Sequence, residues 1–207
     1  AAAGVDDNGR LPYDFGEPVS TDFDTYGLNV TYELPWFSVT SQAGYLKFDQ
    51  SYDDFNDTPS PSPRYLRVDG YDADMFAEEL LLRSAEEGSW RWTLGGMYRD
   101  ATDSIYQCFV SVSIPDGCEG QLPGLTEYTS ESYAVFGEVT RRFAEGRFEL
   151  TGGLRYFEEE SAFQELIAFG PNLPPESLFG KSETFSATTP RVVLTWYPSA
   201  QLTAYTS

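Results

Sequence analysis

Histidine is absent from this chain of 207 residues, and cysteine occurs only twice. Without histidine, neither a serine–histidine catalytic pair nor a histidine-ligated zinc site can be assembled. Neighbouring carboxylates such as Asp53 and Asp54, or those of 158–160, have no spacing typical of glycosidase acids and are interpreted as solvated charge. The sequence therefore argues against an enzyme and indicates neither a cofactor nor a metal site.

Long apolar runs are also missing, since no stretch approaches the roughly 18 apolar residues that a transmembrane helix needs. This does not exclude a membrane, because the strands of a membrane β-barrel expose only alternate residues to lipid. The first ten residues lack the basic segment and apolar core of a signal peptide. We expect that a leader was removed or that the natural N-terminus lies elsewhere.

Positive charge is scarce, with 13 basic residues against 33 acidic ones and a net charge of -20. Nucleic acid is therefore not expected as a partner. Four segments hold 25 of the acidic residues and only 4 of the basic ones: 1–24, 49–74, 100–131 and 158–183. These acidic segments are interpreted either as merely solvated or as a surface potential that concentrates cations or a cationic ligand.

The two cysteines, Cys108 and Cys118, enclose a short segment that contains a Pro-Asp-Gly turn signal. Their spacing predicts a disulfide, which is typical of proteins in an oxidising compartment such as the periplasm or the cell surface. Two unlinked thiols remain the alternative.

A period of two in hydropathy is the main pattern that is present. Apolar and polar residues alternate from Tyr26 to Leu34 and again from Trp90 to Arg99, as in half-buried β-strands. Residues 75–87 contain good helix formers, but their short length and flanking strands favour a strand. We expect eight strands, at Tyr26–Leu34, 36–48, 75–84, 90–99, 131–143, Phe148–Tyr156, 185–197 and from Leu202 onward.

The predicted connections alternate between short and long. The short ones are Pro35, 85–89, 144–146 and 198–201, and the long ones are roughly 49–70, 107–127 and 161–182. Because a meander reverses at each turn, all short turns lie at one end and all long loops at the other. This is the layout of outer-membrane β-barrels, which have short periplasmic turns and long extracellular loops.

The tryptophans lie close to the predicted short turns. Tryptophan favours the interface between membrane and water, so we expect one periplasmic belt of Trp36, Trp90, Trp92 and Trp196. Six apolar residues are predicted to face lipid: Leu28, Val30, Leu94, Leu150, Leu154 and Leu194. The opposite faces carry many Arg and Glu residues, which suits a wet lumen or the solvated face of an ordinary antiparallel sheet.

Five segments, in order, resemble the barrel of TonB-dependent outer-membrane receptors: FAEELLLRS, WRWTLGGMYRD, SYAVFGEVT, RFELTGGLRYFEEE and TPRVVLTWYP. The resemblance covers most of residues 71–207, and its matched motifs are structural, so it identifies no ligand-binding residue. It implies an all-β fold, an antiparallel up-and-down meander forming about eight strands of a larger transmembrane β-barrel. In that family a barrel of about 22 strands is closed by an N-terminal plug domain.

The resemblance implies that residues 1–207 are a partial receptor barrel, with the plug domain and the remaining strands lying outside this chain. It further implies active uptake of a scarce nutrient, such as a ferric siderophore or cobalamin, across the outer membrane of a Gram-negative bacterium. The expected partners are membrane lipid, lipopolysaccharide, the nutrient and the TonB complex, reached through the missing N-terminal region. Two alternatives are a complete eight-stranded outer-membrane barrel with an adhesive or structural role and a soluble β-barrel that binds small ligands.

Overall fold

A computed structural model describes residues 19–56, 65–111, 122–167 and 178–207. These residues form eight strands: β1 (Ser20–Glu33), β2 (Phe37–Asn56), β3 (Tyr65–Ser84), β4 (Trp90–Ser111), β5 (Leu122–Phe143), β6 (Phe148–Ile167), β7 (Gly180–Ser199) and β8 (Leu202–Thr206). Across the described ranges, no helix has the length and apolar character needed to cross a membrane.

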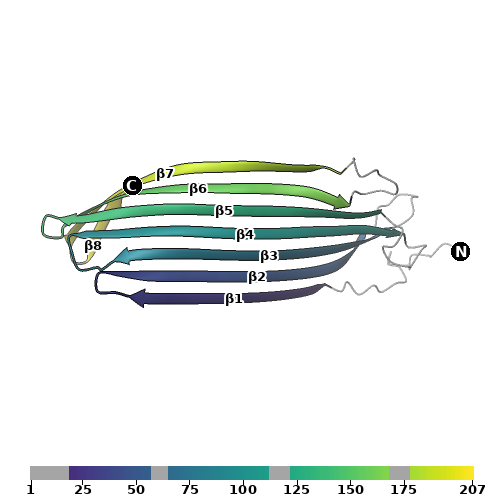
Figure 1. The fold of residues 1–207 in the computed structure, drawn as a ribbon, viewed down its shortest axis with the longest axis horizontal. Helices are drawn as coiled ribbons and strands as arrows, with labels where there is room; N and C mark the ends of the chain where they lie inside the picture. Colours follow the sequence, from purple (N-terminus) through teal and green to yellow (C-terminus); the bar gives the residue numbers. More distant parts are fainter. Residues whose placement is uncertain (1–18, 57–64, 112–121, 168–177) are drawn as a thin grey trace, which may run out of the picture.

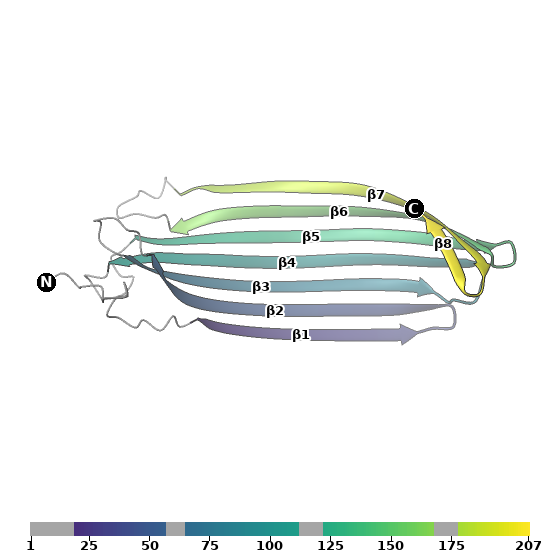
Figure 2. The same cartoon turned by 180° about the vertical axis from the view of Figure 1, so that it is seen from behind.

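The strands form one antiparallel sheet in which every strand pairs with its neighbours in sequence, in the order β1 to β8 (Figures 1 and 2). This confirms the predicted all-β up-and-down meander with eight strands. Residues 75–84 are part of β3, so the strand was the correct choice over the helix. Register is unbroken along most strand pairs, with irregularities between Leu125 and Thr126 in the pairing of β5 with β6 and between Trp196 and Ser199 in the pairing of β7 with β8.

Short turns join the strands at one end of the sheet (Figure 2). The turn between β5 and β6 places Ala144, Glu145 and Gly146 at positive φ, and Gly146 has the largest value, 85°. Glycine adopts this backbone conformation without the steric penalty of a Cβ, so its position at the end of the turn suits the tight reversal. These turns lie where the sequence predicted short connections.

The predicted strand ends were wrong at the opposite end of the sheet. β2 continues to Asn56, β4 to Ser111 and β6 to Ile167. More than half of the residues predicted to lie in long loops therefore belong to strands. Hydropathy does not alternate clearly there, because one face of the strands is acidic and the other mixes aromatic with polar residues, and the period-two signal disappears. Backbone pairing nevertheless continues, for example from Asp22 opposite Asp49 to Ser20 opposite Ser51.

Candidate functional site

The two faces of the sheet differ in crowding, which identifies the inside of the curve. Leu81, Ser132, Ala134 and Glu149 are buried, and the register places all four on one face. On the same face, a Cβ at Gly95 would lie only 2.3 Å from the Phe136 ring. Side chains converge on the concave side of a curved sheet. We therefore call this face the inner wall and the opposite face the outer wall.

The outer wall carries aromatic side chains next to the short turns. Trp90, Trp92 and Trp196 lie there, and the exposed Trp36 lies in the turn before β2. The ring of Phe148 stacks between Phe143 and Trp196, with centroid distances of 5.7 and 6.3 Å. The four tryptophans thus gather at the end where the sequence predicted them, and three phenylalanines that the sequence did not single out join them: Phe37, Phe143 and Phe148.

A second row of aromatic residues crosses the outer wall farther from the short turns. It consists of Tyr26, Tyr45, Phe76, Tyr98, Tyr133 and Tyr156. Two of the phenol groups donate hydrogen bonds to carboxylates one step farther along the wall, from Tyr45 to Asp74 at 2.5 Å and from Tyr98 to Glu131 at 3.2 Å. The sequence did not reveal this row, since its members align only once the register is known.

The two aromatic rows are separated by the same length of strand in β2, β4 and β6. Nine residues run from Phe37 to Tyr45 in β2, from Trp90 to Tyr98 in β4 and from Phe148 to Tyr156 in β6. A tilted transmembrane β-strand needs about 9–11 residues to cross the hydrocarbon layer. All six residues predicted to face lipid lie on the outer wall between the rows: Leu28, Val30, Leu94, Leu150, Leu154 and Leu194.

Beyond the second aromatic row, the outer wall becomes acidic. Ten carboxylates with described side chains lie there: Asp22, Asp24, Asp49, Asp72, Asp74, Asp100, Glu127, Glu131, Glu158 and Glu160. Lys47 is the one basic residue among the described side chains of this region. A hydrogen bond with Asp49 and partial burial raise the pKa of Asp72, as expected where carboxylates crowd together.

At the short-turn end, the inner wall holds a compact charged cluster around Glu149. The Glu149 carboxylate accepts hydrogen bonds from Arg142 at 2.6 and 2.8 Å and from the Tyr197 hydroxyl at 3.2 Å, and it lies 2.8 Å from the Arg91 guanidinium. Only 10% of the Glu149 side chain is exposed. Two arginines and a phenol thus satisfy a nearly buried charge, which is the arrangement that a buried carboxylate requires.

Midway along the inner wall, a hollow of about 620 Å³ is bordered by a mainly apolar surface that includes Phe136 and Phe157, together with charged residues. Arg191 forms an ion pair with Glu138 at 3.3 Å, on the border of this hollow. One step beyond it, Arg99 donates to Glu159 at 3.1 Å and to Ser130 at 2.9 Å. The Arg99 Nε and the Ser132 hydroxyl are buried without a hydrogen-bond partner. Charges in this number suit a water-lined or protein-filled lumen and not an apolar core.

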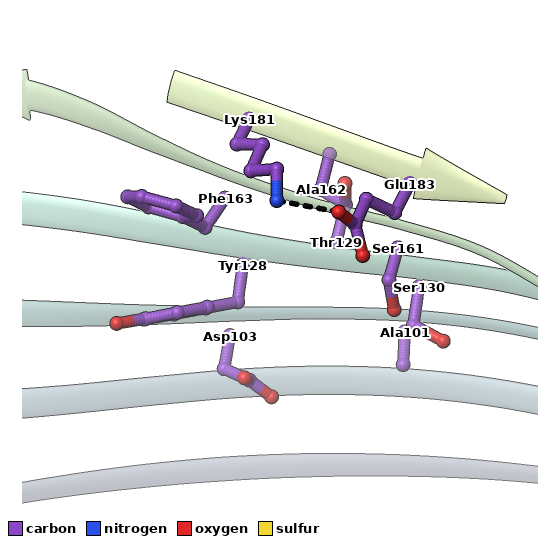
Figure 3. Close-up of a pocket in the computed structure, with 10 residues that line it drawn as sticks. All are labelled: Ala101, Asp103, Tyr128, Thr129, Ser130, Ser161, Ala162, Phe163, Lys181 and Glu183. Carbon is purple, nitrogen blue, oxygen red and sulfur yellow. Dashed lines mark ion pairs between the residues drawn. The ribbon is translucent and has the colours of Figure 1, made fainter. Parts of the chain in front are cut away.

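The inner wall beyond this level is aromatic. Tyr128 and Phe163 lie in one register row with Asp103 and Lys181, and their rings stack at 5.9 Å with an angle of 28°. Phe179, just before β7, packs on Phe163 at 5.4 Å. We call Tyr128, Phe163 and Phe179 the aromatic shelf. Two of its rings border a hollow of about 380 Å³, where Figure 3 shows them extending in the same direction along neighbouring strands.

Two charged groups border the shelf. Lys181 forms an ion pair with Glu183, and this contact lowers the pKa of Glu183 (Figure 3). Asp103, on β4, has no ion-pair partner among the described side chains and lies near Tyr71. Burial, followed by the Asp103 charge, raises the pKa of Tyr71. The sequence did not single out the shelf, because stretches such as 122–130 lacked clear alternation.

The predicted disulfide stays a prediction, since Cys118 and the side chain of Cys108 lie outside the described residues. The acidic segments show a placement that the sequence did not predict. Of the described carboxylates beyond the second aromatic row, ten are on the outer wall and only four are on the inner wall, namely Asp103, Glu159, Glu165 and Glu183.

Comparison with known proteins agrees with this architecture. A family model described as "TonB dependent receptor-like, beta-barrel" matches residues 2–207. The chain belongs to the TonB-dependent receptor family. Members of this family are outer-membrane β-barrel transport receptors of Gram-negative bacteria, not enzymes. A comparison with curated protein sequences gives no match.

Three solved receptors share the fold of this receptor barrel. The ferric yersiniabactin uptake receptor FyuA of Yersinia pestis matches 95% of the chain with a TM-score of 0.71 and 14% identity. The ferric preacinetobactin receptor BauA of Acinetobacter baumannii matches 90% with a TM-score of 0.63 and 18% identity. The ferric citrate transporter FecA matches 88% with a TM-score of 0.59 and 10% identity. The chain spans 29%, 30% and 26% of these proteins, respectively.

Proposed function

We propose that this chain forms part of the wall of an outer-membrane receptor that imports a scarce nutrient, such as a ferric siderophore, with energy supplied through TonB. The observation that carries the proposal is the pair of aromatic rows on the outer wall, which together span nine residues in each of β2, β4 and β6. Together with the apolar residues between them, these rows match the lipid-facing band of an outer-membrane barrel. The family match supplies the transport class.

The polar inner wall supports transport over the two alternatives. A soluble ligand-binding barrel would need its apolar face inside, whereas here the exposed leucines and valines lie on the outer wall. A complete eight-stranded barrel would need β1 to pair with β8, and these strands lie at opposite edges of the described sheet. The open edges also imply that the chain acts within a larger barrel, since lipid cannot satisfy unpaired backbone groups.

The orientation follows from the same proposal. The short turns lie in the periplasm, the Trp36, Trp90, Trp92 and Trp196 belt lies at the periplasmic interface, and the acidic part of the outer wall faces the lipopolysaccharide layer. The acidic outer wall changes our expectation about the ligand. Most of the described carboxylates in this half point away from the lumen, so they are better placed to meet lipopolysaccharide and its divalent ions than to attract a cationic nutrient.

The test is uptake of radioactive iron by the full receptor, expressed in a Gram-negative strain that lacks its own siderophore receptors. Iron supplied as ferric siderophores should enter cells that contain the receptor and TonB, and should not enter cells in which TonB is deleted. Accumulation that is independent of TonB would show passive diffusion through a pore. Failure with all ferric complexes, but TonB-dependent uptake of cobalamin, would retain the receptor class and replace the nutrient.

A further inference from the structure

We infer that the aromatic shelf of Tyr128, Phe163 and Phe179 holds a flat aromatic ring of a ligand that carries no net negative charge. The inference rests on the proposed function, because it names the chemical class of the nutrient that the receptor would import. The shelf lies on the inner wall beyond the level of the membrane band, where a ligand that enters from outside the cell first meets the barrel.

Ring stacking provides the first argument. Phe163 packs between Tyr128 and Phe179 at centroid distances of 5.9 and 5.4 Å. The outer members of this array are open, since Tyr128 is 41% and Phe179 59% exposed. An aromatic ligand ring would continue the array with the offset or edge-to-face geometry that aromatic pairs prefer. The hollow beside it, about 380 Å³, falls at the lower end of the usual volumes of small-molecule sites.

Charge provides the second argument. Lys181, the cation beside the shelf, already pairs with Glu183, and Arg99, one level closer to the membrane, pairs with Glu159. Asp103 is the charged group left without an ion-pair partner among the described side chains that line the hollow. An anionic ligand would meet this carboxylate with no unpaired cation among the described side chains that line the hollow, whereas a neutral or cationic ligand would gain a hydrogen-bond acceptor.

These groups disfavour a carboxylate-rich complex such as ferric citrate, the cargo of the transporter FecA, because it has no ring to stack and brings negative charge. The hollow also carries the polar side chains of Asp103, Ser161, Lys181 and Glu183. A sugar is therefore the competing occupant that the experiment has to separate from an aromatic ligand.

Four ferric complexes separate the effect of the ring from that of charge. Tris(tropolonate) iron is neutral and aromatic, tris(acetohydroxamate) iron is neutral without rings, tris(catecholate) iron is anionic and aromatic, and ferric citrate is anionic without rings. Binding of each to the purified full receptor would be measured by equilibrium dialysis with radioactive iron. We expect the tropolonate complex to bind about tenfold more tightly than each of the other three.

Substitutions in the aromatic shelf test whether the shelf causes this preference for the tropolonate complex. Phe163→Leu should weaken binding of the tropolonate complex about 3–10-fold, the range of a lost aromatic pair, and leave the acetohydroxamate complex unchanged. Phe179→Leu tests the same shelf on an exposed ring, should Phe163→Leu fail to fold. Phe76→Leu, on the outer wall, is the matched control and should change neither. Asp103→Asn should tighten binding of the catecholate complex about threefold, the size expected for one solvated charge.

The outcomes distinguish this inference from the function on which it rests. Equal binding of complexes with and without rings, or a preference for citrate or catecholate, overturns the inference and leaves an iron receptor. Displacement of the tropolonate complex by maltose assigns a sugar and also overturns it. If none of the four complexes binds and none supplies TonB-dependent iron uptake, both the iron cargo and the inference are wrong.

Discussion

The inner and outer walls of the extracellular half are built from alternate residues of the same strands, yet they differ in kind. The outer wall has ten described carboxylates and one lysine, while the inner wall has four carboxylates, of which two are paired with Arg99 or Lys181. Aromatic rings occupy the inner wall at the same height. The large negative charge of this half therefore lies mainly on the outer wall, which faces lipid and lipopolysaccharide in the proposed orientation. A ligand inside the barrel would instead contact the aromatic inner wall.

The largest expected effect comes from placing an arginine on the outer wall of the membrane band and comparing it with an arginine on the inner wall. Leu94→Arg on the outer wall should cost about 2–4 kcal/mol of stability in a bilayer if the site lies near the midplane, because the charge enters hydrocarbon. Thr93→Arg, the neighbouring inner-wall residue, should cost far less, since Glu138 lies directly opposite it in the register. Urea unfolding of the full receptor in lipid vesicles measures both, and equal costs would show that the outer wall does not face lipid.

A second contrast concerns crowding. Gly95→Ala places a methyl group 2.3 Å from the Phe136 ring and 2.9 Å from Leu81, so we expect a loss of about 1–3 kcal/mol from overpacking. Gly152→Ala, on the outer wall, meets nothing within 4 Å and should be nearly neutral. Combining Gly95→Ala with Phe136→Leu should recover most of the lost stability in the same unfolding experiment. No recovery would mean that the backbone, and not the ring, limits the space.

The sequence predicted one wall better than the other because lipid imposes a simple rule. Between the aromatic rows, alternate residues such as Leu28 and Val30 must be apolar, so the period of two is visible and the strands were found. Beyond Tyr156, residues 158–160 are acidic on both walls, so the strand was mistaken for a loop. The aromatic shelf could not be predicted, because Tyr128 and Phe163 are 35 positions apart and only the register brings them together.

A smaller effect should distinguish the carboxylates of the outer wall, which faces lipopolysaccharide in the proposed orientation, from those of the inner wall. Without divalent ions, the acidic outer wall should be repelled by lipopolysaccharide phosphates, so chelation should lower the melting temperature of the receptor in vesicles that contain lipopolysaccharide. Asp72→Asn with Asp74→Asn should reduce this drop, by an amount that corresponds to less than about 1 kcal/mol, the scale of exposed charge interactions. Asp103→Asn, on the inner wall, is the control and should leave the drop unchanged.

The smallest expected difference is in proton affinity. A hydrogen bond with Asp49 favours the protonated form of Asp72 and raises its pKa, whereas Lys181 favours the charged form of Glu183 and lowers its pKa. As the pH falls from neutral, Asp72 should therefore take up its proton at a higher pH, and Glu183 at a lower pH, than each would without its partner. Asp49→Asn should lower the pKa of Asp72, and Lys181→Gln should raise that of Glu183. Carboxyl ¹³C NMR across a pH series measures both titrations. Coincident midpoints that neither substitution moves would mean that the carboxylates of the two walls are equally solvated, and the contrast between a crowded acidic outer wall and a paired inner wall would fail at these positions.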